Sequence, residues 1–367
     1  MSTVLIIGDT DVDGTGAATI IRWYYQSKYL FPQLRPKIKV WFPERTVLNE
    51  RFADATWVRS VAHDNDLIYL CDTGLNIEEG NKNLGEILAP KTIYFDHHQT
   101  NYDHQEQYAK NYKGFYVKEG ARCTAKIAFD TLLKEFDVPH SFLATRRYRR
   151  FVKIKEFAQL VNDIDMWIRK YARSTELADV VNALGPDKAH EEFNKVCLTP
   201  GTNTETMKEA LATVRHHKVA SLKLGQSTLV KHKNYKVPFY TAIINGYQSE
   251  VASDLVHPRG MIACYNLDTN TISFRIGSEY SGMKYSRNNT ISCLDFAELF
   301  GGGGHPQAAG ISPSEAAKIL KVMSKEMGRF LLEEEKNGRV QRSSRNSTNR
   351  SKTGKDSSGG ERNPDKS

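Results

Sequence analysis

The sequence predicts an α/β protein with two domains, a parallel-sheet domain followed by a smaller α/β domain. Its 367 residues suffice for two domains of roughly 150 residues each. In the first 190 residues, short apolar runs alternate with stretches of helical spacing, which is typical of a parallel sheet covered by helices on both faces. A polar segment then precedes a second group of strands. We expect a first domain, a helical connection, a second domain and a tail over residues 1–198, 199–225, 226–335 and 336–367.

The expected strands are short apolar runs bounded by polar residues or glycine. Helices are expected between those of the first domain, among them Thr15–Lys28 and Thr124–Phe136. The strands of the first domain are Val4–Ile7, Lys37–Phe42, Asp66–Cys71 and Lys91–Phe95. Those of the second domain lie at Tyr240–Ile244, Met261–Asn266 and Thr271–Ile276.

Composition and charge exclude several classes of protein. No apolar run approaches the roughly 20 residues of a membrane-spanning helix, and the first residues lack the basic stretch of a signal peptide. Five dispersed cysteines without a C-x-x-C pair indicate reduced thiols, so we expect a cytoplasmic protein with no membrane partner.

Residues 336–367 contain nine basic and three acidic residues, which leaves +2 of the formal charge of +8 for the rest of the chain. We expect this tail to be disordered, and the nearly neutral body does not by itself indicate a polyanionic partner.

Acidic residues follow three of the expected strands of the first domain. In a parallel sheet, ligands bind outside the carboxyl ends of the strands, so these acids are expected to meet at one edge. The acids and the two histidines beside them are Asp9, Asp11, Asp13, Asp72, Asp96, His97 and His98. Clustered carboxylates repel one another and therefore call for a cation.

The mixture of hard oxygen ligands and imidazole suits Mn²⁺, with Mg²⁺, Fe²⁺ or Co²⁺ as alternatives. A single aspartate at a strand end is equally well explained as a helix N-cap. Consecutive histidines in a strand point to opposite faces, so His97 and His98 reach one site only where the strand opens into a loop. The other His-His pair, His216-His217, lies in a helical stretch and is interpreted as a surface pair.

A glycine run in the second domain, Gly301–Gly304, precedes His305. Its backbone N–H groups are expected to be free to cradle a phosphate, with Arg275 upstream on a strand. A helix is expected to begin at Ala308-Ala309-Gly310. The alternative interpretation is a flexible turn.

Two further segments have two interpretations each. Asn162–Trp167 contains Asp163 and Asp165. In one interpretation, one of them supplies a metal ligand; in the other, one caps a helix and the other is solvated. Arg146–Lys155 is basic with interleaved aromatic residues, which suits either a nucleic-acid backbone or a solvated helix face.

Read together, these motifs resemble the DHH phosphoesterase superfamily. Asp11-x-Asp13-Gly14 is similar to its first motif, Asp72 to its second, Asp96-His97-His98 to its third, and Asp163/Asp165 to its fourth. The stretch from Gly301 to Gly310 is similar to the glycine signature of the DHH-associated C-terminal domain. The resemblance covers residues 4 to 310 in family order, and the Asp-x-Trp form at residue 165 favours Asp165 over Asp163 as the ligand.

The resemblance implies a parallel-sheet DHH domain, a smaller mixed-sheet domain and an active site in the cleft between them. It implies two Mn²⁺ ions, with Mg²⁺ or Co²⁺ as substitutes. The implied metal ligands are Asp9, Asp11, Asp13, Asp72, His97 and Asp163 or Asp165. Asp72 would bridge the ions, and Asp72, His97 and His98 would act in catalysis. The residues implied in binding the substrate are Arg275, Ser278, Gly302, Gly303, Gly304 and His305.

The implied activity is Mn²⁺-dependent exonucleolytic hydrolysis of short single-stranded RNA or DNA to mononucleotides. One alternative is hydrolysis of a cyclic dinucleotide, a linear dinucleotide or 3′-phosphoadenosine 5′-phosphate. Another, from a different class, is a non-catalytic nucleic-acid-binding module. The sequence leaves the polarity of digestion and the oligomeric state open, with a homodimer among the options.

Overall fold

The computed structural model contains two compact units that divide between Val214 and Arg215. It describes residues 2–29, 31–73, 84–98, 101–102, 105–118, 122–133, 146–198, 203–232, 238–281, 292–305 and 307–311. The expected tail over 336–367 and most of the polar segment near residue 200 lie outside these ranges. Within them, no helix is long and apolar enough to cross a membrane.

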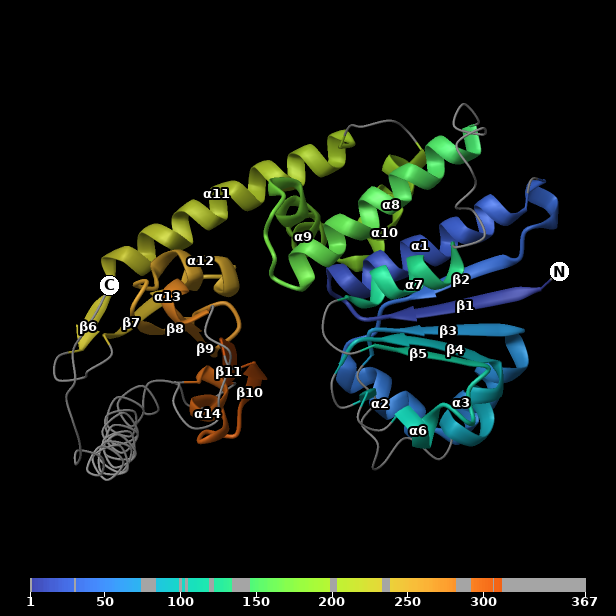
Figure 1. Ribbon diagram of the computed structural model, residues 1–367, viewed down its shortest axis with the longest axis horizontal. Helices are drawn as coiled ribbons and strands as arrows, with labels where there is room; N and C mark the ends of the chain where they lie inside the picture. Colours follow the sequence, from blue (N-terminus) through green and yellow to red (C-terminus); the bar gives the residue numbers. More distant parts are fainter. Residues whose placement is uncertain are drawn as a thin grey trace, which may run out of the picture. The chain divides into compact units, whose positions relative to one another are not determined.

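A five-stranded sheet forms the centre of the first unit (Figure 1). Its strand order is β2-β1-β3-β4-β5, and every neighbouring pair is parallel. The strands are β1 (Thr3–Gly8), β2 (Lys37–Trp41), β3 (Leu67–Cys71), β4 (Thr92–Asp96) and β5 (Gly114–Val117). The four expected strands and their parallel arrangement are confirmed. The edge strand β5 was not expected, because its four residues are too short to show a pattern.

Helices cover both faces of this sheet (Figure 1). One face carries α1 (Val12–Lys28), α7 (Thr124–Leu132), α8 (Arg146–Asp165), α9 (Ala172–Leu184) and α10 (Pro186–Leu198). The other carries α2 (Arg45–Ala53), α3 (Ala55–Asp64) and α6 (Gln105–Tyr108). Short helical turns lie at Pro32–Leu34, Leu84–Leu88 and Ala89–Lys91.

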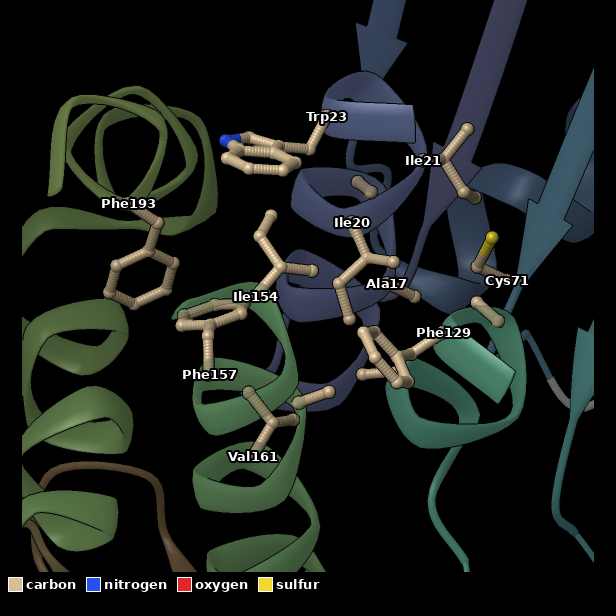
Figure 2. Packing of buried hydrophobic residues seen from close by; sticks show 14 of the residues in the cluster. Ala17, Ile20, Ile21, Trp23, Cys71, Phe129, Ile154, Phe157, Val161 and Phe193 are labelled. Carbon is tan, nitrogen blue, oxygen red and sulfur yellow. The ribbon is translucent and has the colours of Figure 1, made fainter. Parts of the chain in front are cut away.

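The core on the α1 face joins helices that are far apart in sequence. In Figure 2, Ile20 and Trp23 of α1 lie beside Ile154 of α8, and the rings of Phe157 and Phe193 join α8 to α10 with centroids 5.3 Å apart. Burial of such side chains stabilises each by roughly 1.5–3 kcal/mol relative to exposure. This packing anchors α8, whose last residue is Asp165.

The segment Arg146–Lys155 is the first half of α8. Phe151 and Ile154 within it are buried in the core, whereas Lys155 is exposed. The apolar residues of the segment therefore serve packing, which agrees with the interpretation of an amphipathic helix.

The strand order places a topological switch point between β1 and β3. The chain leaves β1 towards β2 through α1 on one face and returns to β3 through α2 and α3 on the other. In sheets of this order, ligands bind at the point where the connections diverge. Asp9, Asp13 and Asp72 follow these two strands.

The second unit has a six-stranded mixed sheet in the order β10-β11-β9-β8-β7-β6. Only β7 and β8 are parallel among the described pairs. The long helix α11 (Glu205–Ser227) spans the boundary between the two units. The second unit also contains α12 (Gln248–Leu255), α13 (Ser278–Ser281) and α14 (Cys293–Glu298). The strands are β6 (Val230–His232), β7 (Phe239–Ile244), β8 (Met261–Asn266), β9 (Thr271–Ile276), β10 (Gly303–His305) and β11 (Ala308–Ile311). The three expected strands and the expected fold class, a parallel-sheet unit and a smaller mixed-sheet unit, are confirmed.

The expected helix at Ala308 is wrong, because the segment is strand β11. It pairs antiparallel with β10 and with β9, where Ala309 lies opposite Phe274. Ala309 and Ile311 are buried in the core of this unit. The consecutive small residues Ala308-Ala309-Gly310 suit a tightly packed helix as well as a short strand, so the local sequence did not distinguish the two.

Candidate metal centre

Three carboxylates from different elements converge on one imidazole nitrogen. His97 Nε2 lies 3.7 Å from Asp13 Oδ2, 3.5 Å from Asp72 Oδ1 and 3.6 Å from Asp165 Oδ2. Asp13 lies in the first turn of α1, and Asp165 is the last residue of α8. Asp72 and His97 directly follow β3 and β4. The convergence that the sequence predicts at this edge of the sheet is present in the structure.

The turn from β1 into α1 is shaped by its own acids and glycine. Asp11 caps α1, and its Oδ1 accepts hydrogen bonds from the N–H groups of Asp13 at 2.9 Å and Gly14 at 3.0 Å. A Cβ on Gly14 would lie 2.4 Å from the backbone N and O of Asp9, so only glycine fits this turn. The N-cap interpretation is therefore correct for Asp11, and the tight turn directs Asp13 inwards.

The N-terminus of α7 holds the two buried carboxylates. Asp13 is fully buried, and its oxygens accept from Thr124 N at 2.6 Å and Ala125 N at 2.8 Å. Thr124 Oγ1 donates to Asp72 Oδ1 at 3.0 Å. The positive end of the helix dipole favours negative charge at this position. Sequence reasoning did not find Thr124 as a residue of the site.

Asp72 has a left-handed backbone conformation, with φ of 59°. This conformation is uncommon outside glycine and costs free energy on the order of 1–3 kcal/mol. The N–H of Asp72 donates to Phe95 O of β4 at 3.0 Å, which ties the turn after β3 to the neighbouring strand. The strained turn directs the carboxylate towards His97.

Asp96 supports His98 and lies outside the group of acids around His97. Its Oδ1 accepts from His98 Nδ1 at 2.8 Å, and its Oδ2 accepts from Asn101 Nδ2 at 2.6 Å. The hydrogen bond with Asp96 raises the pKa of His98, more than burial lowers it. His98 Nδ1 also lies 3.6 Å from Asp72 Oδ1. The sequence-predicted loop after β4 does allow both histidines to lie beside Asp72.

The two acids of the fourth motif have different surroundings. Asp163 accepts hydrogen bonds from Lys170 N and Tyr171 N, both at 3.0 Å, and from Ser174 Oγ at 2.6 Å. Although burial opposes its ionisation, these hydrogen bonds lower the pKa of Asp163. Asp165 instead lies beside His97, and its buried Oδ2 has no hydrogen-bond partner. The geometry therefore favours Asp165 as the residue that faces a cation.

Cys123, the residue before α7, lies at the site, although the sequence analysis assigned no cysteine to it. Ligand atoms of Asp13, Cys123 and Asp165 all lie within 4.8 Å of one another, as do those of Asp72, His97 and His98. Burial and the nearby charges of Asp13 and Asp165 raise the pKa of the Cys123 thiol well above its usual value. An isolated cysteine carries no spacing signal in the sequence, so the site could not have been assigned a thiol in advance.

The electrostatics of the site favour a bound cation. Burial, followed by the charges of Asp13 and its neighbours, raises the pKa values of Asp72 and Asp165 well above their usual range. Asp11 is exposed as a residue, yet desolvation by the surrounding protein and the charges of Asp13 and Asp9 raise its pKa to about 6. Together with the unpartnered Asp165 Oδ2, this set of oxygen and nitrogen donors fits a divalent cation such as Mn²⁺.

Asp9 directly follows β1, at the start of the turn into α1. Its Oδ1 accepts from Thr10 N at 2.6 Å, and the residue lines a small hollow with Arg45 and Thr73. No described contact joins its carboxylate to His97. The charge of Asp9 nevertheless contributes to the raised pKa of Asp11, so the two carboxylates interact electrostatically.

The candidate substrate residues lie in the second unit. Arg275 of β9 donates to Ser273 Oγ and Ser249 Oγ, each at 2.8 Å, and to Phe274 O at 2.7 Å. Burial lowers the pKa of this guanidinium. Ser278 begins α13 and is exposed.

The glycine run is partly paired with its own chain. Gly301 N donates to Glu298 O at 3.1 Å and Gly302 N to Ala297 O at 2.8 Å, so these two N–H groups are not free, contrary to expectation. Gly303, Gly304 and His305 form β10 opposite β11. The side chain of His305 is outside the described part of the structure.

Fold and site together define a class of protein: a doubly wound parallel sheet that gathers carboxylates and imidazoles suited to divalent cations at its switch point. Residues 3–161 match the model of the DHH family, N-terminal domain. The chain therefore carries a DHH-family domain, which confirms the resemblance to the DHH phosphoesterases. No curated protein matches this sequence closely enough to serve as a relative.

Solved structures of low sequence identity share the fold. The chain is 14% identical to exonuclease RecJ bound to manganese, with a TM-score of 0.51 and 90% of each chain covered. It is 12% identical to PggH, a pGpG-specific phosphodiesterase from Vibrio cholerae, with a TM-score of 0.51 and coverage of 90% of this chain and 99% of that one. For an exopolyphosphatase-related protein from Bacteroides fragilis, the identity is 12% and the TM-score 0.50, with coverage of 90% of this chain and 93% of that one.

Proposed function

We propose that this protein is a Mn²⁺-dependent phosphodiesterase that removes mononucleotides from the end of short single-stranded RNA or DNA. The observation that carries the proposal is the convergence of Asp13, Asp72 and Asp165 on His97 Nε2 within 3.5–3.7 Å. Two ions would be held by Asp9, Asp11, Asp13, Asp72, His97 and Asp165. Bound there, the ions would acidify a water and offset negative charge on the phosphodiester.

The chain's own residues would orient the site for this reaction. Thr124 and Ala125 fix the carboxylates of Asp13 and Asp72 through the hydrogen bonds from α7. Asp72, whose Oδ1 lies 3.5 Å from His97 Nε2, would hold an ion together with His97 and His98. Because Asp96 accepts from Nδ1 of His98, Nε2 is the ring atom with which His98 would contact the scissile phosphate or an ion.

The second unit would bind the terminal nucleotide. Arg275 is oriented by Ser249 and Ser273, so its guanidinium is a fixed cation of the kind that binds phosphate. Ser278, Gly302, Gly303, Gly304 and His305 would complete that site. The fold likeness to RecJ supports an oligonucleotide as the substrate class, and the likeness to PggH favours a second candidate, hydrolysis of dinucleotides.

A substrate panel separates these candidates. Wild-type protein with Mn²⁺ is incubated with an end-labelled five-mer, a cyclic dinucleotide, its linear product and 3′-phosphoadenosine 5′-phosphate. We expect stepwise release of mononucleotides from the five-mer. Exclusive cleavage of a dinucleotide or of the bisphosphate would replace the proposed substrate. Metal-independent binding without hydrolysis, with affinity that falls steeply with salt, would support the non-catalytic module instead.

Substitution of His97 tests the metal assignment. His97→Ala removes the nitrogen on which three carboxylates converge, and we expect hydrolysis of the five-mer to fall about a thousandfold, since metal ions contribute several kcal/mol and about 1.36 kcal/mol corresponds to a factor of ten. Asp96→Ala removes the acceptor of His98 Nδ1 and of Asn101 Nδ2 but none of the carboxylates around His97, so we expect a loss of about 10- to 100-fold.

The control for these variants is His216→Ala, which removes an exposed histidine of α11 and should leave the rate unchanged. Circular dichroism verifies that each variant is folded. Full activity of a folded His97→Ala variant with added Mn²⁺ would contradict the assignment.

A further inference from the structure

An exposed loop of aromatic and basic residues follows directly after Asp165. Trp167 and Tyr171 are 42% and 45% exposed, although large aromatic side chains usually pack in the interior. Each ring lies beside a cation: the guanidinium carbon of Arg169 is 4.6 Å from the Trp167 ring centroid, and Lys170 Nζ is 5.2 Å from that of Tyr171. Residues 167–173 contain three basic residues and no acid.

A buried carboxylate holds this loop in shape. Asp163, which is 3% exposed, accepts from the N–H groups of Lys170 and Tyr171 and from Ser174 Oγ. Its carbonyl oxygen accepts from Ile168 N at 2.9 Å and Arg169 N at 3.1 Å. Trp167 and Arg169 both have φ of 54°, a left-handed conformation that is costly for such residues. The hydrogen bonds to Asp163 thus fix the loop in a conformation that exposes the two rings.

A pocket beside the loop is lined in part by residues adjacent to those of the candidate metal centre. Its volume is about 210 Å³, and Lys170 and Tyr171 line it together with Asn162 and Lys126. Lys126 directly follows Ala125, whose N–H binds Asp13, and Asn162 Oδ1 accepts from the N–H of Cys123 at 2.8 Å. Pocket and metal centre therefore share the first turn of α7.

We propose that Trp167 and Tyr171 form a stacking platform for bases of a single-stranded substrate, with Arg169 and Lys170 beside its phosphates. The inference rests on the proposed function and names the residues that would make the enzyme select nucleobase-bearing strands. Aromatic rings stack on any base, and nearby cations follow the backbone. The positive charge of the loop complements a polyanion, which favours a nucleic-acid strand over an apolar protein partner.

The platform predicts a base-dependent loss of binding. Trp167→Ala and Tyr171→Ala are each expected to raise KM for a five-mer about 10-fold or more, the range that one stacked base provides. On a five-mer whose sugars carry no bases, the same variants should change KM much less. Trp167→Phe should restore most of the affinity, because it retains a stacking ring.

The matched control is Phe31→Ala, which removes another exposed aromatic ring of the first unit, 58% exposed. Neither substrate should respond to it. An equal loss on both substrates, or no loss on the five-mer, would overturn the platform; a loop that serves a protein partner would give the latter result.

A binding measurement distinguishes failure of the platform from failure of the proposed function. The probe is a fluorescent phosphorothioate five-mer, titrated by anisotropy with the full chain and its variants. If the wild type binds it in a Trp167-dependent manner but hydrolyses no five-mer, the platform stands and the exonuclease proposal fails. If the wild type hydrolyses the five-mer and Trp167→Ala binds it equally well, the exonuclease proposal stands and the platform fails. Absence of both binding and hydrolysis overturns both.

Discussion

Individual side chains at the candidate metal centre divide into those that converge on His97 and those whose carboxylates are engaged by hydrogen bonds. Asp13, Asp72 and Asp165 face His97, whereas Asp96 and Asp163 have their oxygens engaged by His98, Asn101 and the loop after α8. All five are aspartates at or near strand or helix ends, so residue type and position in the elements do not separate the two roles, although the Asp-x-Trp form favoured Asp165 over Asp163. The difference arises from which N–H groups the fold brings to each carboxylate.

Asp11 provides a prediction of pH dependence. Its pKa of about 6 in the folded chain exceeds the value near 3.9 of an unfolded chain, so the folded state binds a proton more tightly. In metal-free protein this group therefore lowers stability as pH rises from about 4 to about 6, and the loss persists at higher pH. Asp11→Asn retains the N-cap but cannot ionise.

We expect metal-free Asp11→Asn to unfold at the same temperature as the wild type near pH 4 and at a higher temperature at pH 7.5. Thermal unfolding in EDTA at several pH values measures the difference. Saturating Mn²⁺ at pH 7.5 should reverse the order, because Asp11 is a proposed ligand. A difference that does not vary with pH would contradict the assigned pKa.

At the scale of elements, helix α7 organises the site that strands β1 and β3 supply. Its first two N–H groups bind Asp13, and the hydroxyl of Thr124 binds Asp72. The glycine-rich hairpin shows the limits of local patterns: the same small residues suggested a helix at Ala308, yet pairing with β9 made them a strand. Pairing partners distant in the chain cannot be read from a short segment.

Thr124→Val tests the role of α7. The substitution keeps the shape of the side chain but removes the hydroxyl that orients Asp72, and supporting hydrogen bonds of this kind are worth about 10- to 100-fold in metal affinity. We expect Mn²⁺ binding, measured by electron paramagnetic resonance, to weaken by that factor.

Thr92→Val is the matched control, since Thr92 is equally buried and its hydroxyl bonds only Leu88 O among the described contacts. It should lower stability by about 1 kcal/mol without changing Mn²⁺ affinity. Equal Mn²⁺ affinities of the wild type and Thr124→Val would show that α7 does not orient the site.

At the scale of the whole molecule, the described residues of the candidate metal centre all belong to the first unit, whose boundary lies at Val214. Ligands that bind only the folded state stabilise it by about 2.7 kcal/mol at a hundred times the Kd. For a unit of this size that free energy corresponds to about 5 to 10 °C. Mn²⁺ is therefore expected to raise the unfolding temperature of the first unit and not that of the second.

Differential scanning calorimetry of the full chain with EDTA and with Mn²⁺ measures this effect. Two transitions, of which one moves, are the expected result. A shift of similar size in both transitions, or no shift in either, would contradict a metal site confined to the first unit. Mg²⁺ and Co²⁺ in the same experiment compare the substitutes.

The sequence by itself determined four strands of the first sheet and three of the second, the parallel character of the first sheet and the acids at its edge, because buried strands are continuous apolar runs and their ends carry the polar residues. It favoured Asp165 over Asp163 only through the Asp-x-Trp form, and it did not determine that Cys123 and Thr124 join the site or that a loop presents Trp167 and Tyr171. Those features depend on contacts between residues that are far apart in the chain, such as Asn162 with Cys123 and Thr124 with Asp13. Only the packing of α7 and α8 against α1 brings these residues together, so tertiary structure alone decided them.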